Sequence, residues 1–229
     1  MTTLNSHLAT INDRIRQAAI AAGRAPESVR LVAVSKTHPA GSIREALAAG
    51  QTVFGESYIQ EAREKIAALP DAPAEWHFIG HLQTNKAKYA VRLFELIHSV
   101  DSLRLAEAID QEAAKRGKVQ RVLIQVNIAG EATKSGSAPE AAAALVQQAA
   151  ALPHLSVEGL MTLPPFFDDP VRARPFFKRL RKIRDTITAA SPHIRLPELS
   201  MGMTGDFEAA IAEGATLVRI GTAIFGDRS

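Results

Sequence analysis

The sequence predicts a parallel α/β barrel of the TIM-like (β/α)8 type, preceded by one additional N-terminal helix. Eight short apolar runs, many of them β-branched, alternate with longer helical patterns, which is typical of a parallel sheet. The length of 229 residues fits one barrel of this type. No linker divides the chain, so we expect residues 1–229 to form a single domain.

The expected elements follow from apolar periodicity. Residues 4–22 carry Leu4, Leu8, Ile11 and Ile15 on one stripe, which predicts an amphipathic helix ending at Gly23. This helix precedes the repeating pattern, so we expect it to pack outside the barrel. The expected strands are residues 31–35, 52–54, 75–79, 96–100, 122–127, 157–161, 195–200 and 216–220.

The segments between these strands are predicted to be helices, several beginning at Ser, Asp or Pro and ending at Gly. The same alternation permits an open doubly wound sheet. We prefer the closed barrel because no Gly-x-Gly-x-x-Gly loop follows the first strand. The helices with the clearest pattern are residues 42–49, 58–69, 103–116, 139–152, 171–190 and 207–213.

Composition excludes several classes of protein. Hydrophobic residues make up 46% and charged residues 22% of the chain, as in globular proteins. The longest apolar runs fall far short of the roughly 20 residues of a membrane span, and no signal peptide pattern opens the chain. The chain contains no cysteine, which excludes disulfides and thiolate chemistry. We therefore expect a cytoplasmic protein without membrane association.

Charge and spacing exclude further partners. The net charge is +3, and the basic residues between 172 and 184 fall within one predicted helix beside acidic residues. A solvated helix face explains them better than a nucleic-acid surface. No group of His, Asp and Glu has metal-site spacing, and no Ser-His-Asp order stands out. We predict no nucleic acid, no metal and no hydrolase.

Lys36 is the first candidate site residue because it directly follows the strand at residues 31–35. In a parallel barrel, the carboxyl ends of the strands and the loops after them form the active face. Partial desolvation at such a position lowers the pKa of a lysine and prepares its amine to attack an aldehyde. An ordinary strand-end lysine that reaches solvent is the alternative.

Two loops that are neighbours in a barrel suggest a phosphate site. They span residues 200–206 and 219–223, and combine small residues with the hydroxyls of Ser200, Thr204 and Thr222. Small residues admit phosphate oxygens to backbone amides, and barrels commonly bind phosphate after strands seven and eight. Turn formation and helix capping are the alternative roles.

Other polar residues at strand ends have less definite roles. Arg219 ends the last strand, where an unpaired charge is costly, so it should meet a carboxylate, a phosphate or a ring nitrogen. His77 alternates with apolar neighbours and is expected to pack or to make a core hydrogen bond. His81 either lines the barrel mouth or caps a helix.

In these segments the sequence resembles the family of pyridoxal 5′-phosphate (PLP) homeostasis proteins. Its members are similar to the N-terminal barrel of alanine racemase, the fold type III barrel that binds this vitamin B6 cofactor. The resemblance covers nearly the whole chain. The segments that carry it are residues 32–37, 54–56, 76–86, 134–136, 159–161, 200–206 and 218–226.

The resemblance implies that Lys36 holds PLP as a Schiff base and that Arg219 approaches the cofactor near its ring nitrogen. Ser57, after the second predicted strand, and Met161, at the end of the sixth, are also expected to bind the cofactor. Ser57 departs from the asparagine common in the family, which puts its contact in doubt. The residues expected around the phosphate are Ser200, Gly202, Met203, Thr204, Gly221 and Thr222.

Two further points follow from the resemblance. Thr204 replaces the commoner serine but keeps the hydroxyl. Lys134 matches a lysine common in the family. It is either a secondary position for PLP or an exposed loop lysine without a role in binding.

The implied function is PLP binding in intracellular PLP homeostasis, as a carrier or reservoir, with no catalytic residues. The related racemases and decarboxylases have an additional β domain and complete their sites across a dimer, whereas only nine residues follow Ile220 here. We expect a monomer, with PLP and apo forms of PLP enzymes as candidate partners. The alternatives are a racemase-like PLP enzyme with Tyr58 or His81 as its base, and a Schiff-base aldolase acting on a phosphorylated sugar.

Overall fold

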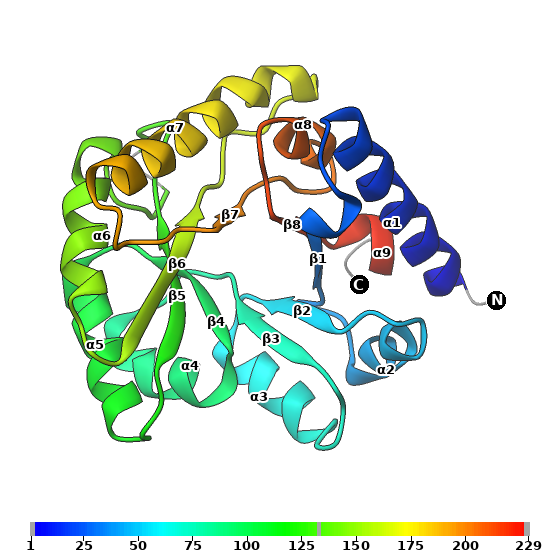
Figure 1. Ribbon diagram of the computed structural model, residues 1–229. Coiled ribbons are helices and arrows are strands. Elements are labelled where there is room, and N and C mark those ends of the chain that lie inside the picture. Colours follow the sequence, from blue (N-terminus) through cyan, green and yellow to red (C-terminus); the bar gives the residue numbers. More distant parts are fainter. Residues whose placement is uncertain (1–2, 132–133, 227–229) are drawn as a thin grey trace.

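The computed structural model describes residues 3–131 and 134–226. Eight parallel strands form a closed barrel in chain order, and β1 completes the closure by pairing with β8 (Figure 1). This arrangement confirms the barrel and excludes the doubly wound sheet. The strands are β1 (Arg30–Val34), β2 (Val53–Glu56), β3 (Glu75–Phe78), β4 (Leu96–Val100), β5 (Gln120–Gln125), β6 (Leu155–Met161), β7 (Glu198–Ser200) and β8 (Leu217–Ile220).

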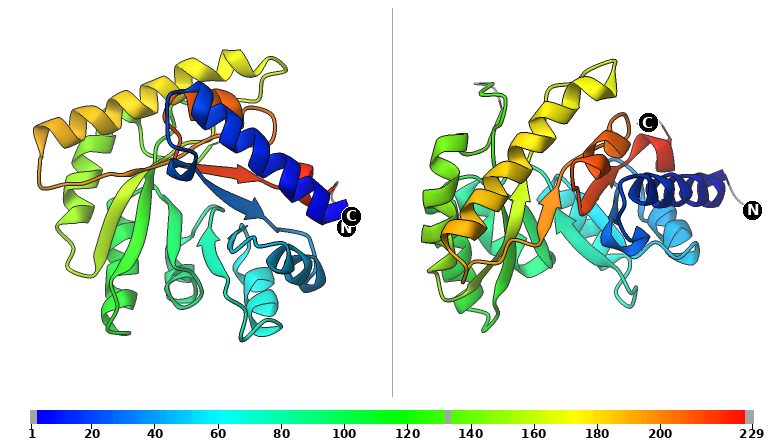
Figure 2. Two further views of the ribbon diagram at one scale, coloured as in Figure 1. Left: turned by 45° about the vertical axis from the view of Figure 1, so that its right-hand side comes forward. Right: turned by 45° about the horizontal axis from the view of Figure 1, so that its top comes forward.

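Helices surround the strands on the outside of the barrel, with short 3₁₀ turns at several of their amino ends (Figures 1 and 2). The α-helices are α1 (Thr3–Ala21), α2 (Ala40–Ala48), α3 (Ile59–Ala67), α4 (Ala87–Leu93), α5 (Leu103–Ala114), α6 (Ala142–Ala150), α7 (Arg174–Ala190), α8 (Phe207–Ala212) and α9 (Thr222–Phe225). The 3₁₀ turns are η1 (Pro26–Ser28), η2 (Thr84–Lys86), η3 (Pro139–Ala141) and η4 (Pro170–Ala173).

The additional helix α1 packs outside the barrel, as expected. It lies alongside α8 and α9 in each view of the ribbon (Figures 1 and 2). Leu8, Ile11 and Ile15 are buried in this contact, and Arg14 pairs with Glu208 on α8 at 2.5 Å. The apolar stripe therefore closes the side of the barrel next to β8 and β1.

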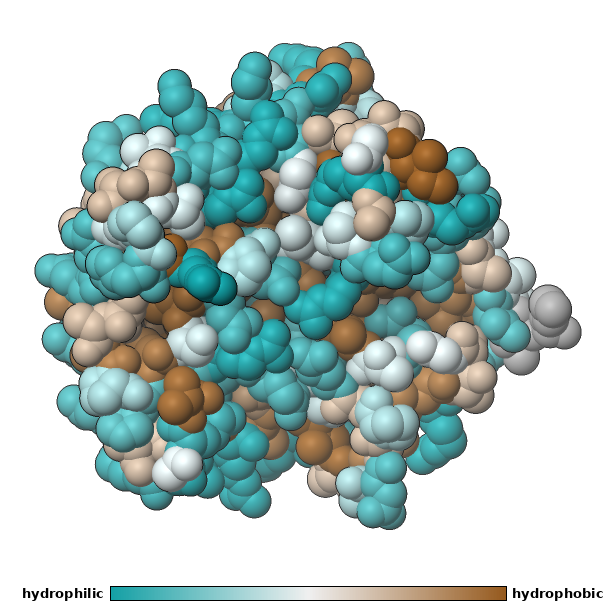
Figure 3. Space-filling model, in the orientation of Figure 1, coloured by the Kyte–Doolittle hydropathy of each residue, from teal (hydrophilic) through white to brown (hydrophobic). Residues whose placement is uncertain are grey.

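The core has two layers, as a filled parallel barrel requires. Apolar side chains from six strands pack in the barrel interior beside buried polar groups, and a larger apolar layer lies between the strands and the helices. Apolar residues appear only in small separate patches on the face shown in Figure 3. No helix among the described residues is long and apolar enough to cross a membrane. The interior layer consists of Val32, Val53, Leu96, Leu123, Met161 and Leu217.

Some predicted boundaries were wrong. The seventh strand begins at Glu198 and not at residue 195, because Pro197 has no N–H to donate to a strand ladder. The helix predicted over residues 171–190 begins with the 3₁₀ turn η4, and α7 starts only at Arg174. The helix α4 was not among the clearest predicted helices.

Candidate functional site

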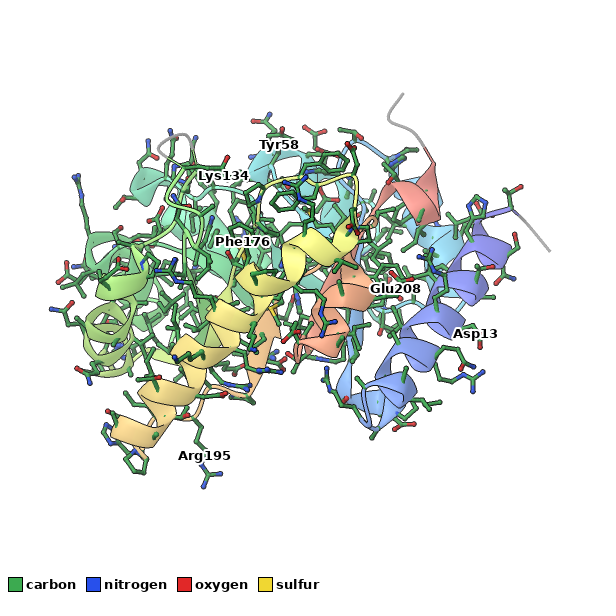
Figure 4. All side chains as sticks on the ribbon, turned by 90° about the horizontal axis from the view of Figure 1, so that it is seen from above. Asp13, Tyr58, Lys134, Phe176, Arg195 and Glu208 are labelled. Carbon is green, nitrogen blue, oxygen red and sulfur yellow. The ribbon has the colours of Figure 1, made fainter. Side chains whose placement is uncertain are left out.

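A cavity of about 460 Å³ opens at the carboxyl ends of the strands, and Lys36 is among its lining residues. Tyr58, after β2, and Lys134, after β5, lie at this end of the molecule, and Arg195, before β7, lies at the opposite end (Figure 4). Seven of the ten expected cofactor-binding residues line this Lys36 cavity. They are Lys36, Ser57, Met203, Thr204, Arg219, Gly221 and Thr222.

The two loops expected to bind phosphate are in contact with each other. Thr222 Oγ1 donates to Thr204 Oγ1 at 3.3 Å, and Arg219 N donates to Gly202 O at 3.0 Å. Asp206 fixes the first loop by accepting from Met203 N at 2.7 Å, and burial raises the pKa of this carboxyl. The geometry thus places two hydroxyls side by side on one cavity wall.

Glycines keep this wall close to the backbone. A Cβ at Gly221 would lie 3.1 Å from Val34 O and 3.3 Å from Val34 Cβ, so Gly221 sits tightly against β1. Gly202 has φ of +93°, and a Cβ there would come within 2.6 Å of Ala210 Cβ on α8. Gly221 therefore shapes the cavity wall, whereas Gly202 allows the loop to turn tightly against α8.

Arg219 is a buried cation held by neutral acceptors. The residue is only 3% exposed. Its Nη1 donates to Ser200 Oγ at 2.5 Å, and its Nη2 donates to Thr162 O at 2.9 Å. Within the described residues, no carboxylate oxygen lies within the 4.0 Å ion-pair distance of its guanidinium. Burial lowers the pKa of Arg219 to about 10, and the charge of Asp206 opposes this shift. A buried cation without a paired carboxylate suits an anionic or lone-pair ligand.

A chain of hydrogen bonds runs from Arg219 through the barrel interior. Ser200 Oγ contacts His98 Nδ1 at 2.8 Å, His98 Nε2 contacts His77 Nδ1 at 3.0 Å, and His77 Nε2 contacts Glu75 at 3.0 Å. Because Arg219 only donates and an ionised carboxylate only accepts, this order assigns the Nε2–H tautomer to both histidines.

The electrostatics agree with that assignment. Burial lowers the pKa of His77 and places that of His98 well below 6.5. The hydrogen bond from His77 lowers the pKa of Glu75 to about 2. The predicted core hydrogen bond of His77 is confirmed. Ser200, which was expected at the phosphate, joins Arg219 to this chain and is itself fully buried.

Three expected residues are absent from the lining of the cavity. Besides Ser200 and Gly202, Met161 is buried in the interior layer of the barrel. Ser57 does line the cavity, and its backbone packs so closely against Gly80 that a Cβ there would lie 2.2 Å from Ser57 O. Ser57 therefore stays on the cavity wall, held there by its backbone.

Sequence reasoning missed an apolar wall formed by the loop after β6. This segment adds Leu163, Pro165, Phe166 and Phe167 to the cavity, and Phe166 is 83% exposed at its edge. The rule that loops after strands build the mouth could have drawn attention to it. Lys134 Nζ donates to Pro164 O in the same loop at 3.1 Å.

His38 was also missed. It lines the cavity two residues after Lys36, and its ring stacks on Phe225 with 5.1 Å between centroids. Nothing in the sequence distinguished it from other histidines, since the stacking joins the segment after β1 to α9, far along the chain.

Comparisons with known proteins agree on one family. The family model described as the N-terminal domain of alanine racemase matches residues 6–229. The chain is 47% identical over 221 residues to the pyridoxal phosphate homeostasis protein of Aquifex aeolicus, covering 96% of both proteins. Clostridium difficile alanine racemase is only 15% identical, with a TM-score of 0.73 over 98% of this chain and 56% of the racemase, and shows likeness of fold alone.

The fold is also close to that of PipY from Synechococcus elongatus. Its structure without PLP matches with a TM-score of 0.88 and 40% identity, covering 98% of this chain and 100% of PipY. The PLP-bound structure of PipY matches with a TM-score of 0.86 and 39% identity over the same shares.

Proposed function

The chain belongs to the family of pyridoxal phosphate homeostasis proteins, and we propose that it stores and carries PLP without turning over a substrate. In this proposal PLP is bound as a Schiff base to Lys36. The observation that carries the proposal is the position of Lys36 in one cavity with Thr204, Thr222 and the buried cation Arg219. The PLP-bound structure of PipY supports the cofactor assignment.

The residues present fit PLP. The volume of about 460 Å³ is typical of small-molecule sites, which span roughly 300–1,000 Å³. Two adjacent hydroxyls and the close-packed Gly221 suit a phosphate, because donors and small residues admit its oxygens. Arg219 presents a charge without a paired carboxylate among the described residues. An amine, a phosphate cradle and an arginine that can face the ring nitrogen together fit PLP.

Each residue has a distinct part in the proposal. Lys36 provides the amine that condenses with an aldehyde, with loss of one water. Thr204 and Thr222 hold the phosphate. Arg219 would face the pyridine ring, where its positive charge would disfavour protonation of the ring nitrogen. Bound PLP supplies an electrophilic aldehyde and a ring that can accept electrons, and an unprotonated ring is the weaker acceptor.

The cavity lining supports storage over racemisation. Tyr58 and His81, the bases expected for a racemase-like enzyme, line a neighbouring depression and not the Lys36 cavity. Tyr58 is also 60% exposed. Asp206, the acidic group among the described lining residues, accepts from the amide of Met203 through Oδ1 and so has a structural role in its own loop. We therefore extend the proposal to a monomeric cytoplasmic carrier that gives PLP to apo PLP enzymes.

The carrier role is tested by exchange and by transfer. The PLP-loaded protein is incubated in D₂O with a panel of amino acids, and deuterium at each α-carbon is followed by NMR. It is then mixed with an apo PLP enzyme whose activity reports received cofactor. For a carrier we expect no deuterium exchange at any α-carbon, and slow activation of the apo enzyme by the PLP it receives. Deuterium exchange at the α-carbon of any amino acid would instead establish the racemase-like alternative.

A further inference from the structure

We propose that Lys65, together with Glu56 and Glu61, positions Lys36 by holding the two peptide units that flank it. These three residues, named here the Lys65 cluster, come from the end of β2 and from α3. The inference rests on the proposed function, in which Lys36 bonds the cofactor.

The cation at the centre of the Lys65 cluster is fully coordinated. Lys65 is 6% exposed, and its Nζ donates to Ser35 O at 2.6 Å, to Glu56 Oε1 at 2.7 Å and to Glu61 Oε1 at 2.6 Å. An ammonium group has three protons to donate, and each has an acceptor here. A buried lysine is costly unless paired and hydrogen-bonded, so this arrangement is specific and not a chance contact.

The cluster fixes the residue before Lys36. Ser35 is fully buried and uses its main-chain and side-chain groups together. Its carbonyl accepts from Lys65, its hydroxyl donates to Glu56 Oε1 at 2.6 Å, and its amide donates to Gly55 O at 3.1 Å. The amide of His38 also donates to the Ser35 carbonyl, at 3.1 Å, so four hydrogen bonds leave this residue little freedom to rotate.

The cluster also fixes the residue after Lys36. Thr37 N donates to Glu61 Oε1, the same oxygen that accepts from Lys65. Thr37 has φ of +68°, and among residues 3–131 and 134–226 it is the one non-glycine residue with a positive φ. For a β-branched residue this conformation is unfavourable and persists only where the surroundings determine it. The Glu61 contact is such a determinant.

The geometry explains why Lys36 would need this device. A lysine side chain has a flexible four-carbon stem, so the direction of its amine depends on how firmly its Cα is held. The described lining of the Lys36 cavity includes Lys36 but none of the three cluster residues. The cluster therefore acts on Lys36 through the backbone and not through the cavity. Lys65 is a positioning residue and not a catalytic one.

The variant that tests this is Lys65→Met combined with Glu56→Gln. Removing the cation alone would leave a buried carboxylate without its ion pair, so glutamine replaces the Glu56 carboxylate with a neutral side chain of similar shape that can still accept from Ser35. Lys118→Met is the matched control, because Lys118 Nζ also donates to backbone carbonyls, those of Val91 at 2.9 Å and Phe94 at 3.4 Å, with no bond to the Lys36 segment.

Two ligands separate positioning from general damage. The rate of adduct formation at Lys36 is measured with pyridoxal, by borohydride trapping and peptide mass spectrometry. The affinity for pyridoxine 5′-phosphate, which keeps the phosphate but has an alcohol in place of the aldehyde, is measured by calorimetry. We expect the double variant to form the adduct at least tenfold more slowly, with pyridoxine 5′-phosphate affinity within twofold of wild type and Lys118→Met unchanged in both assays.

Each other outcome has a defined meaning. An unchanged adduct rate in the double variant overturns the inference, and so does a parallel loss of pyridoxine 5′-phosphate affinity, which marks a merely structural role. If the double variant does not fold, Glu61→Gln takes its place, because Glu61 lies partly at the surface. Glu61→Gln should lower the rate of adduct formation at Lys36 about threefold, and an unchanged rate overturns the inference. A wild-type protein that forms no adduct at Lys36 refutes the proposed function instead.

Discussion

Thr222 Oγ1 donates to Thr204 Oγ1 at 3.3 Å, joining the loop after β8 to the loop after β7 on the wall of the Lys36 cavity. The two residues are separated by 17 others in sequence, and the parallel pairing of β7 with β8 brings their loops together. In the proposed function both hydroxyls turn to the phosphate of PLP, so this contact marks the phosphate end of the cavity.

Removing either hydroxyl should weaken PLP binding. Thr204→Val and Thr222→Val each keep the shape of the side chain, and each should raise the Kd for PLP about tenfold, since a hydrogen bond to a charged group contributes roughly 1.5–3 kcal/mol. Thr204→Ser should bind like wild type. Spectrophotometric titration measures these constants, and pyridoxal, which has no phosphate, is the control ligand. An equal loss of pyridoxal affinity would show that the hydroxyls do not contact the phosphate.

Alanine at the three loop glycines should give three different results. Gly202→Ala introduces a positive-φ side chain against Ala210 and should reduce the free energy of unfolding by roughly 2–4 kcal/mol. Gly221→Ala should lower PLP affinity severalfold with a smaller loss of stability, because its Cβ would press on Val34. Gly205→Ala is the control for stability alone, since no atom outside its neighbouring residues lies within 4 Å of a Cβ there, whereas Gly205 itself lines the Lys36 cavity. Urea unfolding measures the loss of stability in each variant, and PLP titration measures the loss of affinity in Gly221→Ala. A destabilised Gly205→Ala would contradict the prediction.

The histidine chain should make stability depend on pH. Burial lowers the pKa values of His77 and His98 in the folded barrel, whereas the unfolded chain returns both to about 6.5. Below that pH the unfolded chain binds protons that the folded barrel does not. The free energy of unfolding should therefore fall as pH drops below about 6.5, by up to about 1.4 kcal/mol per pH unit for each histidine.

The variant His98→Gln isolates this effect. Urea unfolding at pH 7.5 and 5.5 should show a smaller loss of stability on acidification for His98→Gln than for wild type. The exposed His193→Gln should behave like wild type. Identical pH dependence in wild type and His98→Gln would mean that His98 is not held neutral in the barrel.

Arg219 should matter more for the cofactor than for the fold. Its partners in the described structure are the neutral groups Ser200 Oγ and Thr162 O, so Arg219→Met removes a desolvated cation together with two hydrogen bonds. We expect the Tm without PLP to change by only a few degrees and the rise in Tm on adding saturating PLP to shrink markedly. Differential scanning fluorimetry measures both. A variant stabilised by PLP as strongly as wild type would remove Arg219 from the cofactor site.

The sequence predicted the barrel because each strand is short, apolar and followed by a helical pattern, and it predicted Lys36 because that residue follows the first strand. It could not predict contacts between distant segments. Ser200 was expected at the phosphate, but its hydroxyl is taken up by Arg219 and His98. Met161 was expected at the cofactor, but strand alternation turns its side chain into the interior layer. The Lys65 cluster could not be predicted, because it forms only when the fold brings Lys65 of α3 to the carbonyl of Ser35 after β1.

The most direct test of the account is to locate the covalent PLP adduct. Wild-type protein and Lys36→Ala are mixed with PLP, their visible absorption spectra are recorded, and both are reduced with borohydride and mapped by peptide mass spectrometry. We expect the wild-type protein to show a visible absorption band and one dominant reduced adduct, on Lys36. We expect Lys36→Ala to lose that adduct. A wild-type protein that gives no adduct at Lys36 would contradict the account.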